Sequence, residues 1–318
     1  MDARTMEPRK PEIGNSALYS DVIAGMSRSP KGLSPKWFYD DRGSAIFEEI
    51  TQLSEYYPSR TERAILETGL ARIEAHVPAG AALVELGSGA SVKTRLLLNG
   101  LKGLSTYVPV DISEDFLHAS AAELATDFPR LDVRPVVADF MQPVPLPDLG
   151  GQPVVGFFPG STIGNLSPDA ARALLMRLGE WPDHDTLILG VDLVKAPETL
   201  VAAYDDASGV TARFNLNLLR RLNREAGAEF DLETFRHKAI WNATEARVEM
   251  HLQSLEDQSV QIGDHVVEFA AGETIHTENS HKYSVESLSE LARTAGWHLA
   301  EVLTDPQALF AVAILHRT

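Results

Sequence analysis

Short apolar runs alternate with helical patterns through the middle of the chain. The runs are rich in Val, Leu and Phe, as expected of strands buried on both faces, and they lie at 82–86, 106–111, 133–137, 154–158 and 186–191. Helical spacing or helix-start signals separate them, at 59–76, 93–101, 114–128 and from Ser167-Pro168 onward. Ser59 and Glu62 have the spacing of a capping box for the first of these helices, and Ser113 is the expected cap of the third. This β-α-β-α order predicts a parallel sheet with helices on both faces.

The pattern changes after residue 196. Residues 197–230 are helical in pattern, and 246–252 alternate apolar with polar positions, which predicts a half-buried antiparallel strand with neighbours at 260–262 and 266–269. The α/β pattern returns near the end of the chain. We expect a helix over 284–295 that ends at Gly296, followed by a hairpin over 297–316. We therefore expect two domains. One is formed by 61–196 plus 283–318, and the other by 1–60 plus 197–282.

Composition narrows the class of protein. Lys plus Arg number 28 and Asp plus Glu 45, so the net charge of −17 disfavours a nucleic-acid partner. There is no cysteine, which excludes disulfides, thiolate zinc sites and a cysteine nucleophile. The sequence contains no apolar run of membrane-spanning length, and its first residues lack the apolar core of a secretory signal. We expect a cytoplasmic protein with no membrane partner.

A glycine turn follows the first predicted core strand, in Val84-Glu85-Leu86-Gly87-Ser88-Gly89. Val92 stands where a dinucleotide fingerprint has its third glycine, and no Gly-Lys-Ser/Thr follows, so the turn matches neither that motif nor a P-loop. Glu85 suits S-adenosylmethionine, whose sulfonium and ammonium groups are positive. An ordinary tight turn is the alternative interpretation.

Carboxylates end the next two predicted strands. Asp111 can accept hydrogen bonds from two ribose hydroxyls, and Asp139-Phe140 offers an acceptor and an aromatic face for adenine. The fourth strand ends in a glycine-rich loop, where Gly160 lets a substrate approach the backbone and Asn165 can donate to a carboxylate. In the alternative, Asn165 caps the next helix. Ligands of open α/β sheets bind at this carboxyl edge.

Seven segments, in this order, carry a resemblance to a known family: Pro35-Lys36-Trp37-Phe38-Tyr39-Asp40, Glu55-Tyr56-Tyr57-Pro58, Glu85-Leu86-Gly87-Ser88-Gly89, Gly160-Ser161-Thr162-Ile163-Gly164-Asn165, Asp192-Leu193-Val194-Lys195, Ala203-Tyr204-Asp205-Asp206 and Phe269-Ala270-Ala271-Gly272-Glu273. From about residue 17 onward the chain resembles the histidine Nα-methyltransferase of ergothioneine biosynthesis. The resemblance implies a Rossmann-like class I methyltransferase core with a second, mixed α+β substrate-binding domain. It also implies S-adenosylmethionine-dependent trimethylation of the α-amino group of L-histidine to hercynine.

The resemblance also implies site residues. Those for S-adenosylmethionine are Tyr39, Gly87, Lys93, Asp111, Asp139 and Phe140. Those for histidine are Tyr56, Asn165, Tyr204, Glu278, Asn279 and Ser280. Gly160, from its glycine-rich loop, and Met250, from the predicted half-buried strand, join them as substrate candidates on their position alone. In the family, the Asn and the later Tyr hold the substrate carboxylate, while the Glu and Ser hold the imidazole. The residues around Glu278 depart modestly from the family pattern, which makes Asn279 the least secure assignment.

Several points stay open at this stage. Met250 equally suits core filling, Tyr204 an aromatic anchor, and Tyr56 packing between domains. No general base stands out; Tyr56 or a water is the candidate. The ten histidines lack a zinc-protease spacing, and His276 and His281 have no matching partner, so we expect no metal. We expect a monomer. The rival functions are methylation of another amino acid or a tryptophan-derived amine, and a non-catalytic S-adenosylmethionine-binding regulator.

Overall fold

The computed structural model describes residues 13–89 and 92–318, which form two compact units. Unit 1 contains the chain up to Tyr56, together with Ala196–Thr244 and Val248–Asn279. Unit 2 contains Tyr57–Lys195, Glu245–Arg247 and Ser280–Thr318. The first division therefore falls after Tyr56, where the sequence analysis placed it after residue 60, and the last falls after Asn279.

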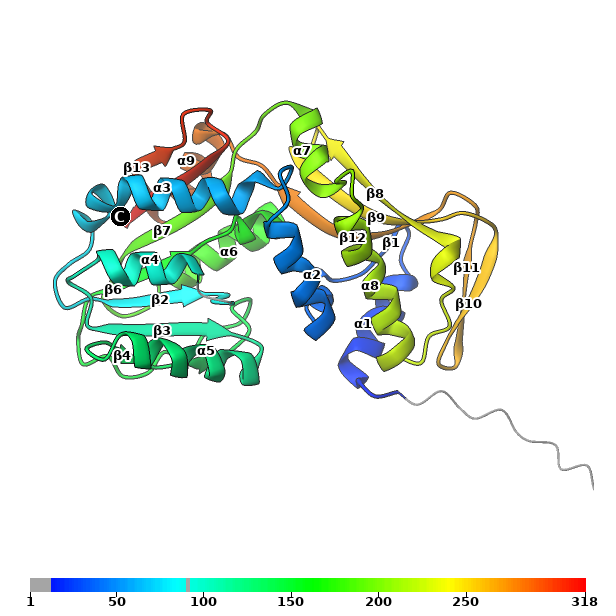
Figure 1. The fold of residues 1–318 in the computed structure, drawn as a ribbon, viewed down its shortest axis with the longest axis horizontal. Helices are drawn as coiled ribbons and strands as arrows, with labels where there is room; N and C mark the ends of the chain where they lie inside the picture. The colour runs from blue at the N-terminus through cyan, green and yellow to red at the C-terminus, as the bar shows by residue number, and fades with distance from the viewer. Residues whose placement is uncertain (1–12, 90–91) are drawn as a thin grey trace, which may run out of the picture. The chain divides into compact units, whose positions relative to one another are not determined.

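Unit 2 is built on one large sheet (Figure 1), in the order β13–β14–β7–β6–β2–β3–β4, with β5 also paired to β3. These strands are β2 (Ala82–Leu86), β3 (Thr106–Asp111), β4 (Asp132–Val133), β5 (Val136–Val137), β6 (Val154–Phe158), β7 (His184–Asp192), β13 (Trp297–Thr304) and β14 (Phe310–Arg317). From β7 to β4 neighbours are parallel, whereas β14 is antiparallel to both β7 and β13. The carboxyl ends of the parallel strands therefore share one edge, as the site predicted from the sequence requires.

Helices cover both faces of this sheet. One core cluster packs α3 (Tyr57–Glu74), α4 (Val92–Gly100) and α5 (Glu114–Asp127) against residues such as Leu83. The other packs α6 (Pro168–Leu178) and α9 (Val285–Thr294) against residues such as Val84. Because successive residues of β2 point to opposite faces, all five are buried, and all but Glu85 are apolar. The predicted α/β class with a parallel, doubly covered sheet is confirmed.

Unit 1 is a mixed α+β unit. Its helical elements are α1 (Ser16–Met26), η1 (Pro35–Phe38), α2 (Asp41–Thr51), α7 (Pro197–Tyr204), α8 (Val210–Glu225) and η3 (Leu232–Thr234). Its strands are β1 (Lys31–Gly32), β8 (Phe235–Asn242), β9 (Arg247–Ser254), β10 (Gln258–Ile262), β11 (His265–Phe269) and β12 (Thr274–His281), of which β9 and β12 extend into unit 2 at one end. Four of them form a sheet in the order β1–β12–β9–β8.

Some sequence predictions were wrong in detail. The single strand expected over 133–137 is split into β4 and β5. Residues 197–230 form two helices, because Asp206 accepts the amides of Val210 and Thr211 and starts α8 anew. The strands β10 and β11 pair with each other in a separate sheet. Glu62 does not cap its helix, since its carboxylate accepts the amide of Gly160.

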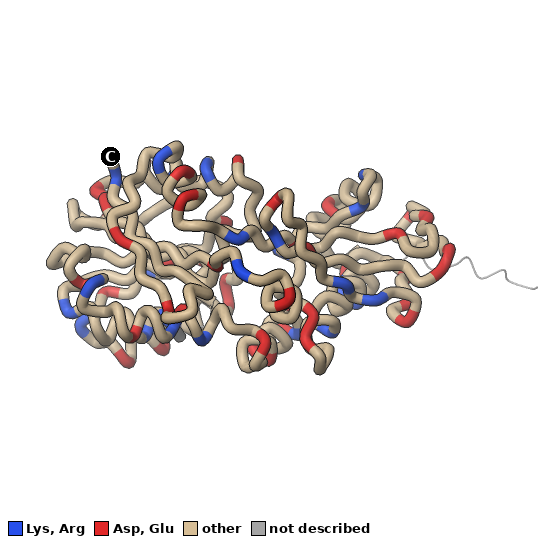
Figure 2. Tube along the Cα trace, turned by 90° about the horizontal axis from the view of Figure 1, so that it is seen from above, with Lys and Arg blue, Asp and Glu red and all other residues tan. Residues whose placement is uncertain are grey.

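Acidic and basic residues are interspersed along the trace of both units (Figure 2). Among the described residues, no helix combines the length and apolar character needed to cross a membrane.

Candidate functional site

The turn after β2 is held by the end of β3. Gly87 and Gly89 have φ values of 66° and 45°, in the left-handed region that favours glycine. The Gly87 amide donates to the Val110 carbonyl at 2.8 Å, and the Gly89 amide donates to Oδ2 of Asp111 at 3.2 Å. The other oxygen of Asp111 accepts the Ser113 amide at 3.0 Å. Asp111 is therefore fixed against the glycine turn by backbone amides.

An aromatic wall stands next to this turn. A Cβ atom placed on Gly87 would lie 3.7 Å from the Phe140 ring, and Phe140 itself packs edge-on against Phe158 with ring centroids 5.3 Å apart. Asp139 accepts the Met141 amide at 2.8 Å, which fixes the loop that carries Phe140. The structure thus gathers Gly87, Asp111 and Phe140 at the carboxyl edge of the sheet. A bare glycine backbone, a carboxylate and an aromatic face fit an adenosyl group.

Glu85 does not belong to this surface. Its side chain is only 2% exposed and accepts hydrogen bonds from the hydroxyls of Thr94 and Tyr107. Burial raises the pKa of Glu85 to about 7, although these two hydrogen bonds oppose the rise. The interpretation of Glu85 as a counter-charge for the sulfonium is therefore replaced by a role inside the core.

A second buried carboxylate, missed by the sequence analysis, connects two of the predicted sites. Glu62 is fully buried, pairs with Lys93, and accepts the Gly160 amide on both oxygens at 2.9 Å. Gly190 makes room for it, because a Cβ there would lie 2.0 Å from Oε1 of Glu62. Lys93, predicted for the cofactor, is thus tied to Gly160, predicted for the substrate. In the helix predicted over 59–76, Glu62 stands beside the apolar stripe like the exposed Glu67 and Glu74, so no local pattern reveals this role.

The loop after β6 is tightly turned. Gly160 and Ser161 have φ values of 76° and 56°, and η2 (Thr162–Asn165) follows at once. Ser167, which accepts the Ala170 amide at 3.3 Å, caps α6, so Asn165 is not that cap. A Cβ on Gly164 would lie 2.7 Å from the His281 carbonyl oxygen, so this loop packs closely on the end of β12.

The end of β7 anchors a buried polar network. Asp192 is fully buried, accepts the Tyr57 hydroxyl at 2.8 Å, and pairs with Lys195 at 2.6 Å and with the fully buried Lys282 at 2.7 Å. Its backbone amide donates to the Ser161 hydroxyl oxygen at 2.9 Å. Burial lowers the pKa of Lys195 to about 8, against the opposing effect of Asp192. The network therefore holds the substrate loop and the end of β12 through shared charges.

Ser280 is oriented by this network. The Lys282 ammonium donates to Oγ of Ser280 at 2.7 Å, and Ser280 is 2% exposed. An ammonium can only donate, so the serine oxygen is the acceptor in this hydrogen bond.

Aromatic rings cluster in unit 1. Tyr39 packs edge-on against Phe47 and Phe214, with centroids 5.6 Å and 5.8 Å away. Tyr56 packs edge-on against Phe47 at 6.2 Å and against Tyr204 at 6.3 Å. Three tyrosines that the resemblance selects therefore belong to one cluster.

Glu278 lies near these tyrosines. The pKa of Tyr39 is raised well above its ordinary value, first by burial and then by the nearby acidic groups of Glu278, Tyr56 and Tyr204. The residue as a whole is 46% exposed, so the burial concerns its hydroxyl end. Tyr39, predicted for the cofactor, thus stands among residues predicted for histidine. The raised pKa keeps its hydroxyl protonated, so it is unsuited to act as a base.

The remaining predicted residues lie on β9 and β12. Met250 is 2% exposed, and its carbonyl accepts the Thr277 hydroxyl at 3.0 Å, which agrees with a core position. Glu278 and Ser280 are two residues apart on β12 and so face the same side of that strand. Oδ1 of Asn279 is buried without a hydrogen-bond partner among the described residues.

The predicted histidine residues are divided between the two units. Gly160, Asn165 and Ser280 belong to unit 2. Tyr56, Tyr204, Met250, Glu278 and Asn279 belong to unit 1, as does Tyr39.

Comparison with known proteins adds independent evidence. A relative from Mycolicibacterium smegmatis named histidine N-alpha-methyltransferase is 44% identical, over 95% of both chains. One of the same name from Mycobacterium tuberculosis is 41% identical, over 95% of this chain and 96% of the relative. A 4-dimethylallyltryptophan N-methyltransferase from Arthroderma benhamiae is 28% identical, over 88% and 87%. The model of the family described as histidine-specific, SAM-dependent methyltransferases matches residues 18–317, and this chain belongs to that family of methyltransferases.

Proposed function

We propose that this protein transfers three methyl groups from S-adenosylmethionine to the α-amino group of L-histidine and so forms hercynine, the first step of ergothioneine biosynthesis. The observation that supports it most is that Glu278 and Ser280 lie on one side of β12. The relatives that are 44% and 41% identical to this chain carry the histidine methyltransferase name. Family membership makes the non-catalytic rival the weaker one.

Unit 2 holds the cofactor in this proposal. Asp111 binds the ribose hydroxyls, Phe140 and Asp139 bind the adenine, and the bare backbone at Gly87 admits the ligand. When bound, S-adenosylmethionine supplies an electrophilic methyl group on a sulfonium. Lys93 acts through Glu62, which fixes the Gly160 loop beside the cofactor.

Imidazole recognition depends on a matched donor and acceptor. The Glu278 carboxylate accepts the N–H of a neutral imidazole, and the Ser280 hydroxyl, whose oxygen already accepts from Lys282, donates to the other ring nitrogen. An indole has one N–H and no ring acceptor, so it leaves the serine donor unmatched. This argues for histidine over the tryptophan-derived amine named for the fungal relative.

The rest of the site positions the amine. In the proposal, Asn165 and Tyr204 hold the substrate carboxylate, Gly160 lets the substrate approach the backbone, and Tyr39 serves the cofactor. The amine must be neutral to attack the methyl group. Tyr39 does not take its proton, because the raised pKa keeps the phenol protonated. Tyr56 or a water is the candidate acceptor. The remainder of the rate enhancement comes from alignment, worth up to about 7–11 kcal/mol.

A substrate panel tests the proposal. The purified protein is incubated with S-adenosylmethionine and, separately, histidine, tryptophan, phenylalanine and 4-dimethylallyltryptophan, and products are read by mass. We expect methylation of histidine alone, reaching the trimethylated product. Glu278→Gln should remove this preference, while Glu256→Gln, at an exposed glutamate, serves as the matched control. Preferred methylation of another amino acid would overturn the substrate assignment, and no methylation at all would overturn the catalytic one.

A further inference from the structure

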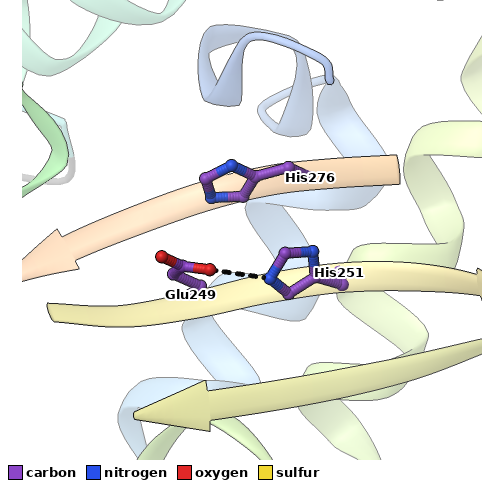
Figure 3. A group of neighbouring side chains, drawn as sticks. All are labelled: Glu249, His251 and His276. Carbon is purple, nitrogen blue, oxygen red and sulfur yellow. Dashed lines mark hydrogen bonds and ion pairs between the residues drawn. The ribbon is translucent and has the colours of Figure 1, made fainter. Parts of the chain in front are cut away.

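Two strands of unit 1 bring an unexpected group of side chains together. Glu249 and His251 lie on β9, and His276 lies on the neighbouring β12 (Figure 3). One ligand atom from each, a carboxylate oxygen and two imidazole nitrogens, lies within 4.8 Å of the others. The rings of His251 and His276 are stacked, with centroids 4.8 Å apart.

The group is held in place by its surroundings. Oε2 of Glu249 bonds to Nε2 of His251 at 3.0 Å, while Oε1 accepts the Asn242 amide at 2.9 Å. Nδ1 of His251 is buried and has no partner among the described residues, so the bond through Nε2 sets the direction of this ring. Figure 3 shows Nε2 of His251 pointing towards Glu249. Asn242 thus acts on the carboxylate as outer-shell groups act in metal sites.

The chemistry of the group also suits a cation. An imidazole coordinates a metal through a ring nitrogen, and His251 and His276 each offer one such nitrogen to the group. Glu249 is 7% exposed and supplies the negative charge. A carboxylate beside two stacked imidazoles on a half-buried sheet face is a donor set for a cation.

We propose that Glu249, His251 and His276 form a binding site for a divalent transition-metal ion of the zinc type. Two imidazoles and one carboxylate are the protein ligands of many open zinc sites, and this set favours zinc over Mg²⁺ or Ca²⁺, which prefer all-oxygen ligands. Ligand atoms around a tetrahedral zinc stand about 3.3 Å apart, given bonds of about 2.0 Å. The separations among the three atoms, at most 4.8 Å, therefore shorten by up to about 1.5 Å on binding.

Binding would reach the β12 backbone. Nε2 of His276 bonds to the Glu278 carbonyl oxygen at 3.0 Å, and coordination through this nitrogen replaces that bond. None of the three residues is among those predicted for the cofactor or the substrate, although His276 lies on the same side of β12 as Glu278 and Ser280. The existence of the site does not depend on the proposed reaction.

Metal binding to the whole protein tests the inference. The protein is stripped with a chelator, dialysed into histidine-free buffer, and titrated with Co²⁺ followed by Zn²⁺ competition. We expect one ion per chain, visible Co²⁺ bands of a low-symmetry site, and no comparable binding of Mg²⁺. Glu249→Gln and His276→Gln should each weaken Zn²⁺ binding by at least ~10-fold, and Asn242→Ala by about 10- to 100-fold.

His265→Gln is the matched control, because His265 is an exposed histidine on β11 outside the group. Its Zn²⁺ affinity should equal that of the wild type. Retained S-adenosylmethionine affinity in each variant shows that the fold is intact. Less than stoichiometric Zn²⁺ retention by the wild type would overturn the proposal, as would equal Zn²⁺ affinity in the wild type and in the two ligand variants.

Discussion

Glu85→Gln should remove a pH dependence of stability that the wild type possesses. The carboxyl of Glu85 is 2% exposed, and its pKa is raised from an ordinary value of 4.5 to about 7. Between these pH values the folded protein keeps a proton that the unfolded chain has lost. Stability conferred by this group is therefore complete below pH 4.5 and is lost as the pH rises through 7.

The size of the effect follows from the shift. A rise of about 2.5 pH units, at 1.36 kcal/mol each, corresponds to roughly 3 kcal/mol of unfolding free energy. Glutamine cannot ionise, yet its carbonyl can still accept from Thr94 and Tyr107. The advantage of wild type over variant should then shrink by about 3 kcal/mol between pH 4.5 and pH 8.

Urea denaturation of both proteins at several pH values provides the measurement. His184 must be considered, because burial lowers its pKa to about 4 and makes stability rise with pH up to its ordinary value of 6.5. That contribution opposes the Glu85 effect in either protein alone but cancels in their difference. A difference that stays constant within about 1 kcal/mol across this range would refute the buried-carboxyl account.

Three further predictions concern ligands. Asp111→Ala should weaken S-adenosylmethionine binding about 10- to 100-fold, since charge-assisted hydrogen bonds contribute about 1.5–3 kcal/mol each; an unchanged dissociation constant by calorimetry would contradict this. Glu278→Ala should lower kcat/KM for histidine by roughly 30- to 1000-fold while cofactor affinity stays constant; steady-state kinetics with histidine and tryptophan decide, and full histidine activity would remove Glu278 from the site. Lys282→Met should raise KM for histidine and reduce unfolding free energy by about 3 kcal/mol, because Asp192 loses one of two buried partners; unchanged values for both would show that the network does not orient Ser280.

The sheet of unit 2 was predictable because its buried parallel strands are almost entirely apolar, as in β6 and, apart from Glu85, in β2. The strand β12 was not predicted, since its sequence Thr-Ile-His-Thr-Glu-Asn-Ser-His is mostly polar although much of it is buried. Its polar side chains are satisfied by tertiary partners, such as Lys282 for Ser280, which no local pattern reveals.

Candidate residues at strand ends were the most predictable part of the site. Asp111 and Phe140 follow parallel strands, and the topology alone brings them to one edge. Glu62 and Asp192 could not be found this way, because their partners are far along the chain. Gly160 lies 98 residues after Glu62, and Lys282 lies 90 residues after Asp192. The Glu-x-His spacing of β9 places Glu249 and His251 on one face of a strand, whereas the zinc-protease spacing applies to helices and does not detect such a pair.

The position of the transferred methyl groups tests the central claim most directly. The protein is incubated with histidine and S-adenosylmethionine carrying a ¹³C-labelled methyl group, and the product is examined by NMR. We expect one labelled signal from three equivalent methyl groups on the α-nitrogen, with an unmodified imidazole. Label on an imidazole nitrogen, or histidine left without label while another amino acid is methylated, would contradict it.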